Sequence, residues 1–135
     1  MAGARTALNA WVPLHLAVYA QAASIAVLED SGHIPVLRGE VVDLLAVRPG
    51  SVYADATAGR GGHAAALADL LGADGTVVLN DLDPANLAFA ADRVRALPED
   101  RRPRVVEVRG SFDDLPERLG ALGLRVDALL ADTCD

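Results

Sequence analysis

The sequence predicts an α/β protein with a single domain built on a parallel β-sheet, and three observations lead to this prediction. Short apolar segments alternate with segments of helical periodicity along the chain. The apolar content, 52% of residues, is mostly Ala, Val and Leu, and only 4% of residues are aromatic. Small aliphatic side chains suit helices packed closely on a buried sheet, which favours this class over a β-sandwich. A glycine-rich loop also separates the first predicted strand from its helix.

The predicted elements follow one another in the order βαβαβαβ. Strands are expected over residues 51–54, 76–79, 104–108 and 126–131, and helices over residues 40–46, 63–71 and 116–122, with a further helix beginning at Pro84. Asp83 is the expected N-cap of that further helix, and Pro84 stands at its first position, where the missing N–H costs nothing. Alternation of this kind demands a parallel sheet with right-handed crossover connections.

The chain divides at the Asp30-Ser31-Gly32 step, so we expect an N-terminal extension over residues 1–32 and the domain over residues 33–135. No Asp, Glu, Lys or Arg occurs from Thr6 to Leu28, but Pro13 and Gln21 interrupt the apolar run. An amphipathic or disordered extension is favoured, and a targeting or signal segment is the alternative. The predicted location is cytoplasmic, or mitochondrial or plastid if the extension is a targeting segment.

Charge and cysteine content narrow the function classes. The formal net charge of −7 argues against this chain alone holding a nucleic-acid backbone, because that affinity comes largely from Lys and Arg. Six arginines lie between Arg93 and Arg109, but acidic residues are interspersed, which favours a solvated face over an RNA contact. The single cysteine, Cys134, supports neither a disulfide framework nor a zinc site. We therefore expect no metal and no membrane association, and the sequence leaves the oligomeric state open.

Residues that can carry chemistry follow each predicted strand. In a parallel sheet, ligands bind beyond the carboxyl ends of the strands, where the strand order reverses. The segments at these positions are Asp55 to His63, Asp81, Ser111 to Asp113, and Asp132. They are therefore predicted to converge on one crevice.

The glycine loop and Asp81 together indicate an adenosine-containing cofactor. Gly59, Gly61 and Gly62 let the backbone approach a ligand and leave N–H donors at a helix start. Asp81 lies 22 positions after Gly59, near the spacing at which an acid meets ribose hydroxyls. The structural alternative is that the glycines only make a tight turn and the acid caps a helix.

The choice of cofactor rests on charge. The loop lacks the G-x-G-x-x-G spacing that accommodates the pyrophosphate of NAD. S-adenosyl-L-methionine has no phosphate and carries two cationic groups, so carboxylates such as Asp55 and Asp132 favour it. An NAD-linked oxidoreductase domain remains the less favoured alternative.

An ordered set of motifs resembles one known family over His33 to Asp132. The motifs are His33-Ile34-Pro35-Val36-Leu37, Glu40-Val41, Asp55-x-Thr57-x-Gly59-x-Gly61-Gly62-His63, Asp81-x-Asp83-Pro84, Gly110-Ser111-Phe112 and Val126-Asp127-x-Leu129-Leu130-x-Asp132. The set is similar to that of the small-subunit (16S) ribosomal RNA cytosine-N4 methyltransferases. The resemblance implies a Rossmann-like S-adenosylmethionine-dependent methyltransferase fold, truncated after the fourth strand, and small-subunit ribosomal RNA as partner through a part outside this chain.

The resemblance also implies roles for individual residues. It implies that the cofactor is lined by Gly61, Gly62 and His63, that its ribose is held by Asp81, that its adenine lies against Phe112, and that the pocket is completed by Asp132. No catalytic residue is assigned. By themselves His63 and Phe112 would be a helix-start residue and a core residue.

The chain departs from the family after Asp132, where it reads Thr133-Cys134-Asp135. The family continues there into a loop, a substrate-binding insertion and the rest of the sheet. A fragment that binds cofactor without catalysis is therefore an open alternative. In the related fold a further strand covers the fourth one, so we expect an exposed strand edge here, with self-association or marginal stability as the result.

Overall fold

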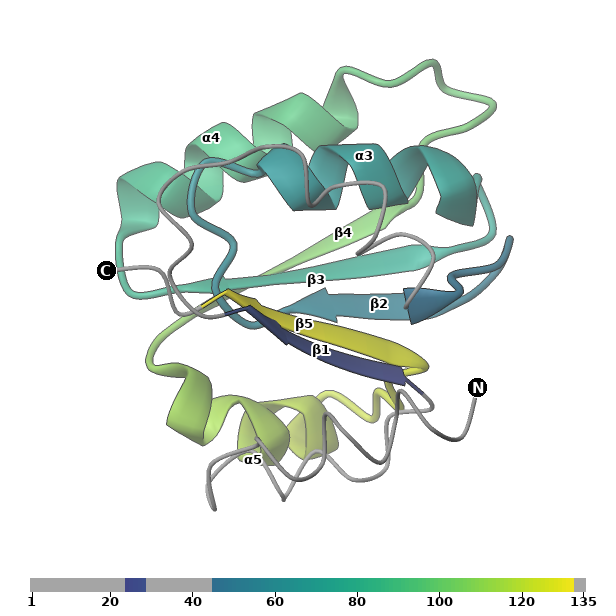
Figure 1. Ribbon diagram of the computed structural model, residues 1–135. Coiled ribbons are helices and arrows are strands. Elements are labelled where there is room, and N and C mark those ends of the chain that lie inside the picture. Colours follow the sequence, from purple (N-terminus) through teal and green to yellow (C-terminus); the bar gives the residue numbers. More distant parts are fainter. Residues whose placement is uncertain (1–23, 29–44, 133–135) are drawn as a thin grey trace.

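The computed structural model describes residues 24–28 and 45–132. Within these residues, five strands form one parallel sheet (Figure 1). The strands are β1 (Ser24–Leu28), β2 (Val52–Asp55), β3 (Thr76–Asp81), β4 (Arg104–Arg109) and β5 (Ala128–Asp132). Their spatial order is β1-β5-β2-β3-β4, and every neighbouring pair is parallel. The predicted parallel α/β class is confirmed.

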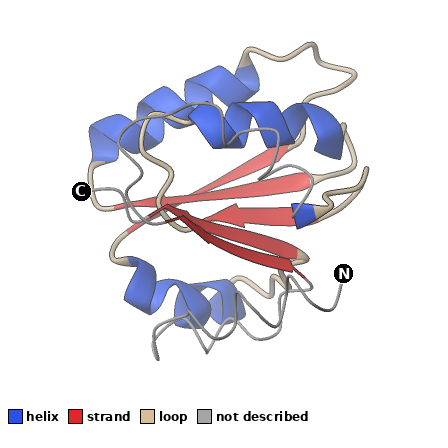
Figure 2. Cartoon of the chain, in the orientation of Figure 1, coloured by secondary structure: helices blue, strands red, loops and turns tan. Residues whose placement is uncertain are grey.

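Helices cover both faces of the sheet. Helices α3 (Gly62–Leu71) and α4 (Pro84–Arg95) lie on one face, and the short helices η2 (Phe112–Asp114) and α5 (Leu115–Ala121) lie on the other (Figure 2). The result is a three-layer arrangement with the sheet in the middle.

Two apolar clusters hold the layers together, and alternate strand residues supply one or the other. In β3, Val77 and Leu79 pack with α3 and α4, whereas Val78 packs with α5. The helices contribute small and branched side chains: Ala64, Leu67, Ala68, Leu71, Leu87, Ala90, Ala91 and Val94 on the first face, and Leu115 and Leu119 on the second. Because Ala is so frequent on α3 and α4, these helices can approach the sheet and each other closely.

The predicted elements after residue 50 are confirmed, with boundaries that differ by one or two residues. Asp83 is the N-cap of α4, where its carboxylate accepts the N–H of Ala85 at 2.8 Å, and Pro84 is the first helical residue. The helix expected over residues 40–46 lies outside the described residues except for its last two positions.

Strand β1 was not predicted, and it corrects the expectation of an exposed edge on β5. The segment Ser24–Leu28 falls inside the predicted extension, yet it pairs with β5 along its whole length. The register joins Ser24 to Ala128, Ile25 to Leu129, Ala26 to Leu130, Val27 to Ala131 and Leu28 to Asp132. The free edge of β5 is therefore covered, and the outermost of the described strands are β1 and β4.

Candidate functional site

The strand order reverses beside β2. The chain proceeds outward from β2 to β3 and β4, and then returns to place β5 on the other side of β2. All strands are parallel, so the loops after β2, β3 and β4 gather at one end of the sheet, which we call the carboxyl end. In α/β proteins, ligands bind in the crevice beside such a reversal.

The loop from β2 to α3 is held by hydrogen bonds from its own backbone N–H groups. Ala56 donates to the carbonyl of Leu130 at 2.8 Å, and Ala58 donates to that of Asn80 at 2.9 Å. The remaining donors include Gly59, to a carboxylate oxygen of Asp81 at 2.8 Å, and Gly61, to the carbonyl of Ala58 at 2.9 Å. The N–H groups of Gly59 and Gly61 therefore both have acceptors within the protein itself.

Helix α4 supports the far side of this loop. Gly61 is the N-cap of α3 with φ of 84°, and a Cβ atom there would lie 2.7 Å from the Cα of Ala90. The guanidinium of Arg60 lies over the ring of Phe89, 4.3 Å from its centre, and Arg93 donates to the carbonyl of Arg60 at 3.3 Å. Gly61 thus permits both the left-handed turn and the close approach of α4.

Asp81, the last residue of β3, bridges two loops. One of its carboxylate oxygens accepts the N–H of Gly59 at 2.8 Å, and the other accepts the N–H of Asp83 at 2.9 Å. The side chain is half-buried. A carboxylate has about four lone-pair positions, so two bonds leave acceptor capacity for a further ligand.

Beneath the loop lies a buried carboxylate, that of Asp55, which is 2% exposed. The hydroxyl of Tyr53 donates to it at 3.2 Å, and the N–H of Thr57 donates to its other oxygen at 3.1 Å. Burial raises the pKa of the Tyr53 hydroxyl well above its usual value of 10.0, and the neighbouring negative charge and hydrogen bond of Asp55 raise it further. Tyr53 therefore stays protonated and acts as a permanent donor to Asp55.

The loop after β4 contains Ser111 and Phe112. Gly110 donates its N–H to the carbonyl of Asp81 at 3.0 Å, so this loop begins beside the end of β3. The hydroxyl of Ser111 accepts the N–H of Asp113 at 3.3 Å and starts the short helix η2. Phe112 is half-buried and packs against the apolar cluster under α5, as its alternative reading as a core residue anticipated.

Three further predicted site residues, Gly62, His63 and Asp132, lie at the carboxyl end of the sheet. Gly62 and His63 are the first two residues of α3, and both are half-buried. Asp132 is the last residue of β5, two positions beyond Leu130, which pairs with Asp55. The structure thus brings these three positions to the same end of the sheet as Asp81.

Asn80 is not among the predicted site residues, although it is polar and only 1% exposed. Its amide nitrogen donates to the carbonyl of Ala56 at 2.9 Å and to the carbonyl of Gly110 at 3.2 Å. The detectable signal was an amide at the end of an otherwise apolar strand, where a buried polar group needs partners. The strand predicted over residues 76–79 ends one residue before Asn80, whereas β3 continues to Asp81.

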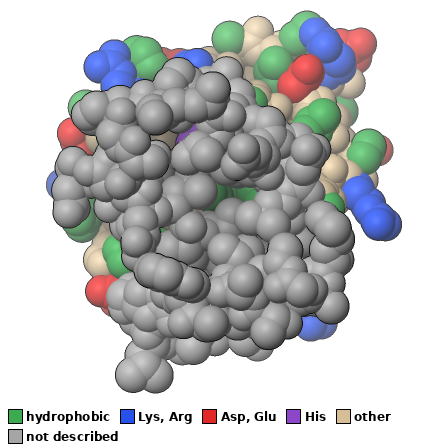
Figure 3. Space-filling model, in the orientation of Figure 1, with side chains coloured by type: hydrophobic (Ala, Val, Ile, Leu, Met, Phe, Trp, Pro, Cys, Tyr) green, Lys and Arg blue, Asp and Glu red, His purple; other side chains and the backbone are tan. Residues whose placement is uncertain are grey.

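Five of the six arginines between Arg93 and Arg109 have partners within the chain. Arg95 pairs with Glu107 at 3.2 Å, and Arg101 pairs with Asp69 at 3.3 Å. Backbone carbonyls accept from Arg93, Arg102 and Arg109. Figure 3 shows acidic and basic side chains interspersed around the described part of one face. These contacts support the prediction of a solvated face.

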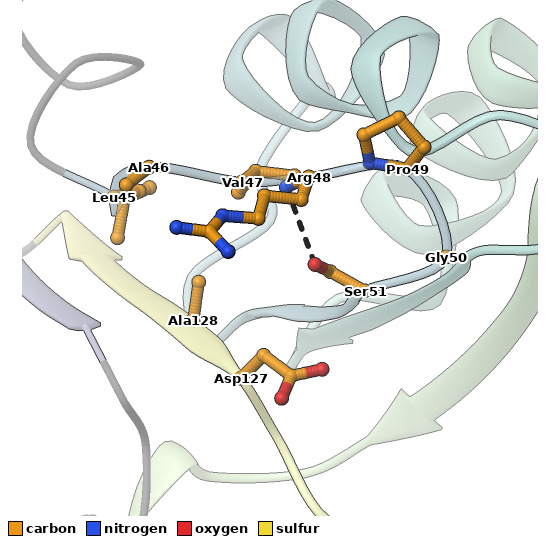
Figure 4. A pocket seen from close by; sticks show the side chains of 9 residues that line it. All are labelled: Leu45, Ala46, Val47, Arg48, Pro49, Gly50, Ser51, Asp127 and Ala128. Carbon is orange, nitrogen blue, oxygen red and sulfur yellow. Dashed lines mark hydrogen bonds between the residues drawn. The ribbon is translucent and has the colours of Figure 1, made fainter.

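A cavity of about 520 Å³ lies at the opposite, amino end of the sheet (Figure 4). It is lined by Leu45, Ala46, Val47, Arg48, Pro49, Gly50, Ser51, Asp127 and Ala128. The N–H of Arg48 donates to the hydroxyl of Ser51 at 3.2 Å, and a carboxylate oxygen of Asp127 accepts the N–H of Val52 at 2.8 Å. This cavity is therefore remote from the predicted crevice.

Within residues 24–28 and 45–132, no group of three or more His, Cys, Asp or Glu side chains is arranged to hold a metal ion. In the same part of the chain, no helix has the length and apolar character needed to cross a membrane.

An open parallel sheet with helices on both faces, a glycine loop at the reversal of strand order and an acid at the end of the next strand define a Rossmann-like α/β protein. The model of the MraW methylase family matches residues 30–133. The chain belongs to this family, which confirms the family resemblance found in the sequence.

Curated relatives carry the name ribosomal RNA small subunit methyltransferase H. The protein from Aromatoleum aromaticum is 45% identical over 101 residues, covering 74% of this chain and 30% of the relative. The protein from Trichlorobacter lovleyi is 42% identical over 106 residues, covering 78% of this chain and 33% of the relative. The chain thus spans about a third of the length of these relatives.

Among solved structures, a protein-L-isoaspartate O-methyltransferase matches 61% of this chain and 27% of its own, with 22% identity and a TM-score of 0.47. The fold class follows from the strand order of the chain itself.

Proposed function

We propose that this chain binds S-adenosylmethionine in the crevice at the carboxyl end of the sheet. In this proposal the ribose is held by Asp81, the adenine lies against Phe112, the start of α3 lines the cofactor through Gly61, Gly62 and His63, and the pocket is completed by Asp132. The bridging position of Asp81, between the glycine loop and the start of α4, is the observation that supports the proposal most directly.

The hydrogen bonds of the glycine loop favour this cofactor over a dinucleotide. A pyrophosphate needs several backbone N–H donors, but those of Ala58, Gly59 and Gly61 already donate to oxygen atoms of the protein. S-adenosylmethionine brings no phosphate, so it makes no such demand. Its positive charge is also better matched to an end of the sheet that carries Asp55 and Asp81.

The carboxylate of Asp81 fits a ribose for a further reason. Its two bonds to the backbone hold both oxygens in fixed directions, so it loses little conformational freedom when it accepts hydrogen bonds from ribose hydroxyls. The half-buried position strengthens such bonds relative to those of an exposed carboxylate.

In the whole protein to which this chain corresponds, we propose transfer of a methyl group to the exocyclic N4 of a cytosine in small-subunit ribosomal RNA. The cofactor supplies the methyl group as a sulfonium substituent. The residues of this chain bind and orient the cofactor, and they hold one side of the reaction geometry. The arginine contacts and the net charge of −7 support RNA recognition by a part of the protein outside this chain.

Calorimetric titration of the chain with S-adenosylhomocysteine, the product form of the cofactor, tests the proposal. We expect saturable one-site binding, with at least a hundredfold loss for Asp81→Ala, because two hydrogen bonds to a charged acceptor contribute about 3 kcal/mol. Asp127→Ala is the matched control, since it removes a carboxylate that also accepts a backbone N–H but lies at the amino end.

Two results would contradict this function. Tighter binding of NAD than of S-adenosylhomocysteine would indicate the oxidoreductase alternative. Equal affinity of the wild type and Asp81→Ala would remove the ribose assignment. Binding without methyl transfer to ribosomal RNA would be the result expected of a non-catalytic cofactor-binding fragment. A cytoplasmic location remains a prediction, to be tested by fractionation.

A further inference from the structure

Asn80 stands at the junction of the two loops that the proposed function assigns to the cofactor. Its amide nitrogen donates to Ala56 in the loop after β2 and to Gly110 in the loop after β4, at 2.9 and 3.2 Å. Its backbone carbonyl also accepts the N–H of Ala58 at 2.9 Å. One residue of the interior strand β3 therefore ties together the loops that follow its two neighbours, β2 and β4.

The orientation of this amide follows from its neighbours. Both of them are carbonyl oxygens, which can only accept, so the NH₂ group of Asn80 must face them. The amide oxygen then points elsewhere, and within the described part of the chain it has no hydrogen-bond partner although it is buried. A buried polar atom without a partner is unfavourable, so the side chain is not accounted for by packing alone.

The side chain of Asn80 lies among apolar side chains, which makes its unpaired amide oxygen more unusual. On the same face of the sheet lie Val78, Val108 and Leu115, among which an aliphatic side chain would pack without any unpaired oxygen. What an aliphatic residue could not do is hold the carbonyls of Ala56 and Gly110. The two loop contacts are therefore the contribution that only an amide at this position makes.

We propose that Asn80 is a positioning residue that sets the separation between the glycine loop and the adenine-facing loop. Gly110 is held on both sides, because its carbonyl accepts from Asn80 and its N–H donates to the carbonyl of Asp81. Phe112 follows two residues later, so the anchor at Gly110 restricts where its backbone can lie. The inference rests on the proposed function for its ligand, but the linkage of the loops does not depend on any ligand.

The first experiment is a double-mutant cycle on S-adenosylhomocysteine affinity. Asn80→Leu is expected to weaken binding about tenfold, since it leaves both loop carbonyls without their donor. Phe112→Ala should then cost much less in the Asn80→Leu background than in the wild type, because a ring in a displaced loop no longer stacks on adenine. Asn80→Gln keeps an amide donor and is expected to recover part of the affinity.

Val78→Ala is the matched control, since Val78 lies on the same strand and face two residues earlier and its aliphatic side chain can donate no hydrogen bond to either loop. It should lower the melting temperature without changing the affinity or the effect of Phe112→Ala. Undiminished affinity in a folded Asn80→Leu protein, or a full Phe112→Ala effect in that background, would overturn the positioning role.

Hydrogen exchange of the wild-type chain tests whether the loops after β2 and β4 are linked, and it does so even if a variant does not fold. The amides of Ala58, Gly59 and Gly110 should exchange through one common opening, since Asn80 and Asp81 hold all three. Separate opening free energies for the two loops would overturn the proposal. A wild type that shows the common opening but does not bind S-adenosylhomocysteine would refute the proposed function and leave the linkage standing.

Discussion

The two ends of the sheet use the same interaction for different purposes. At the amino end, Asp127 accepts the N–H of Val52 and returns its own N–H to the Val52 carbonyl, so it fastens β5 to β2. At the carboxyl end, Asp81 accepts from Gly59 and Asp83 and fastens one loop to another. Asp127 is exposed, whereas Asp81 is half-buried. The same kind of hydrogen bond therefore joins two strands at the amino end and two loops at the carboxyl end.

Gly61→Ala is expected to have the largest effect on stability, because it disturbs the packing of the glycine loop on α4 at the carboxyl end of the sheet. The added methyl group would meet Ala90 at under 3 Å, and the residue would have to keep a positive φ of 84°. We expect a loss of about 3 kcal/mol in the free energy of unfolding, measured by urea denaturation. Gly120→Ala on α5, where no atom lies within 4 Å, should be neutral or slightly stabilising, and a similar loss there would contradict the packing argument.

Tyr53→Phe removes the donor to the buried Asp55 carboxylate and is expected to cost about 2 kcal/mol of stability at neutral pH. The pKa of Tyr53 is raised in the folded state, so stability is fully present below pH 10.0 and falls as the pH rises further, because the unfolded chain then loses the proton first. Denaturation between pH 9 and 11 should show this fall in the wild type and less of it in Tyr53→Phe. An identical pH dependence would contradict the assignment.

Phe112→Ala tests the adenine contact. Stacking on an aromatic ring contributes about 1 to 3 kcal/mol per base, so the affinity for S-adenosylhomocysteine should fall about tenfold or more by calorimetry. The ring also packs under α5, so some loss of stability accompanies the change. Phe89→Ala is the control, since it removes an aromatic ring of α4 that lies under the guanidinium of Arg60. An equal loss of affinity in Phe89→Ala would argue against a specific role for Phe112.

Asp127→Ala should have the smallest effect and completes the comparison between the ends. Because the carboxylate is exposed, water can replace it at the Val52 N–H, and we expect about 1 kcal/mol less stability. Cofactor affinity should stay unchanged. A large loss of affinity, measured on folded protein, would mean that the two ends are coupled.

Local signals in the sequence were sufficient for most of the fold. The Asp83-Pro84 pair predicted the start of α4 because capping depends on adjacent residues only. The convergence of Asp55, Asp81 and the end of β5 followed from the geometry of any parallel sheet, without side-chain detail. Contacts of this kind are implied by the order of the elements.

What could not be predicted depends on partners distant in sequence. No role could be predicted for Asn80, because its two acceptors, Ala56 and Gly110, lie 24 and 30 residues away. The close packing of Gly61 on Ala90 of α4 could not be predicted either, because no local pattern relates the two residues. Strand β1 was overlooked because a short apolar run carries no mark of the strand it will pair with.

The pairing of β1 with β5 has a consequence for the order in which the fold assembles. Each of its residue pairs joins positions whose numbers differ by 104, such as Ser24 and Ala128, so β1 leaves the ribosome long before its partner exists. Loop closure over such a distance is slow compared with the local pairing of β2 with β3. The sheet is therefore expected to grow from its centre during synthesis, and β1 to dock last.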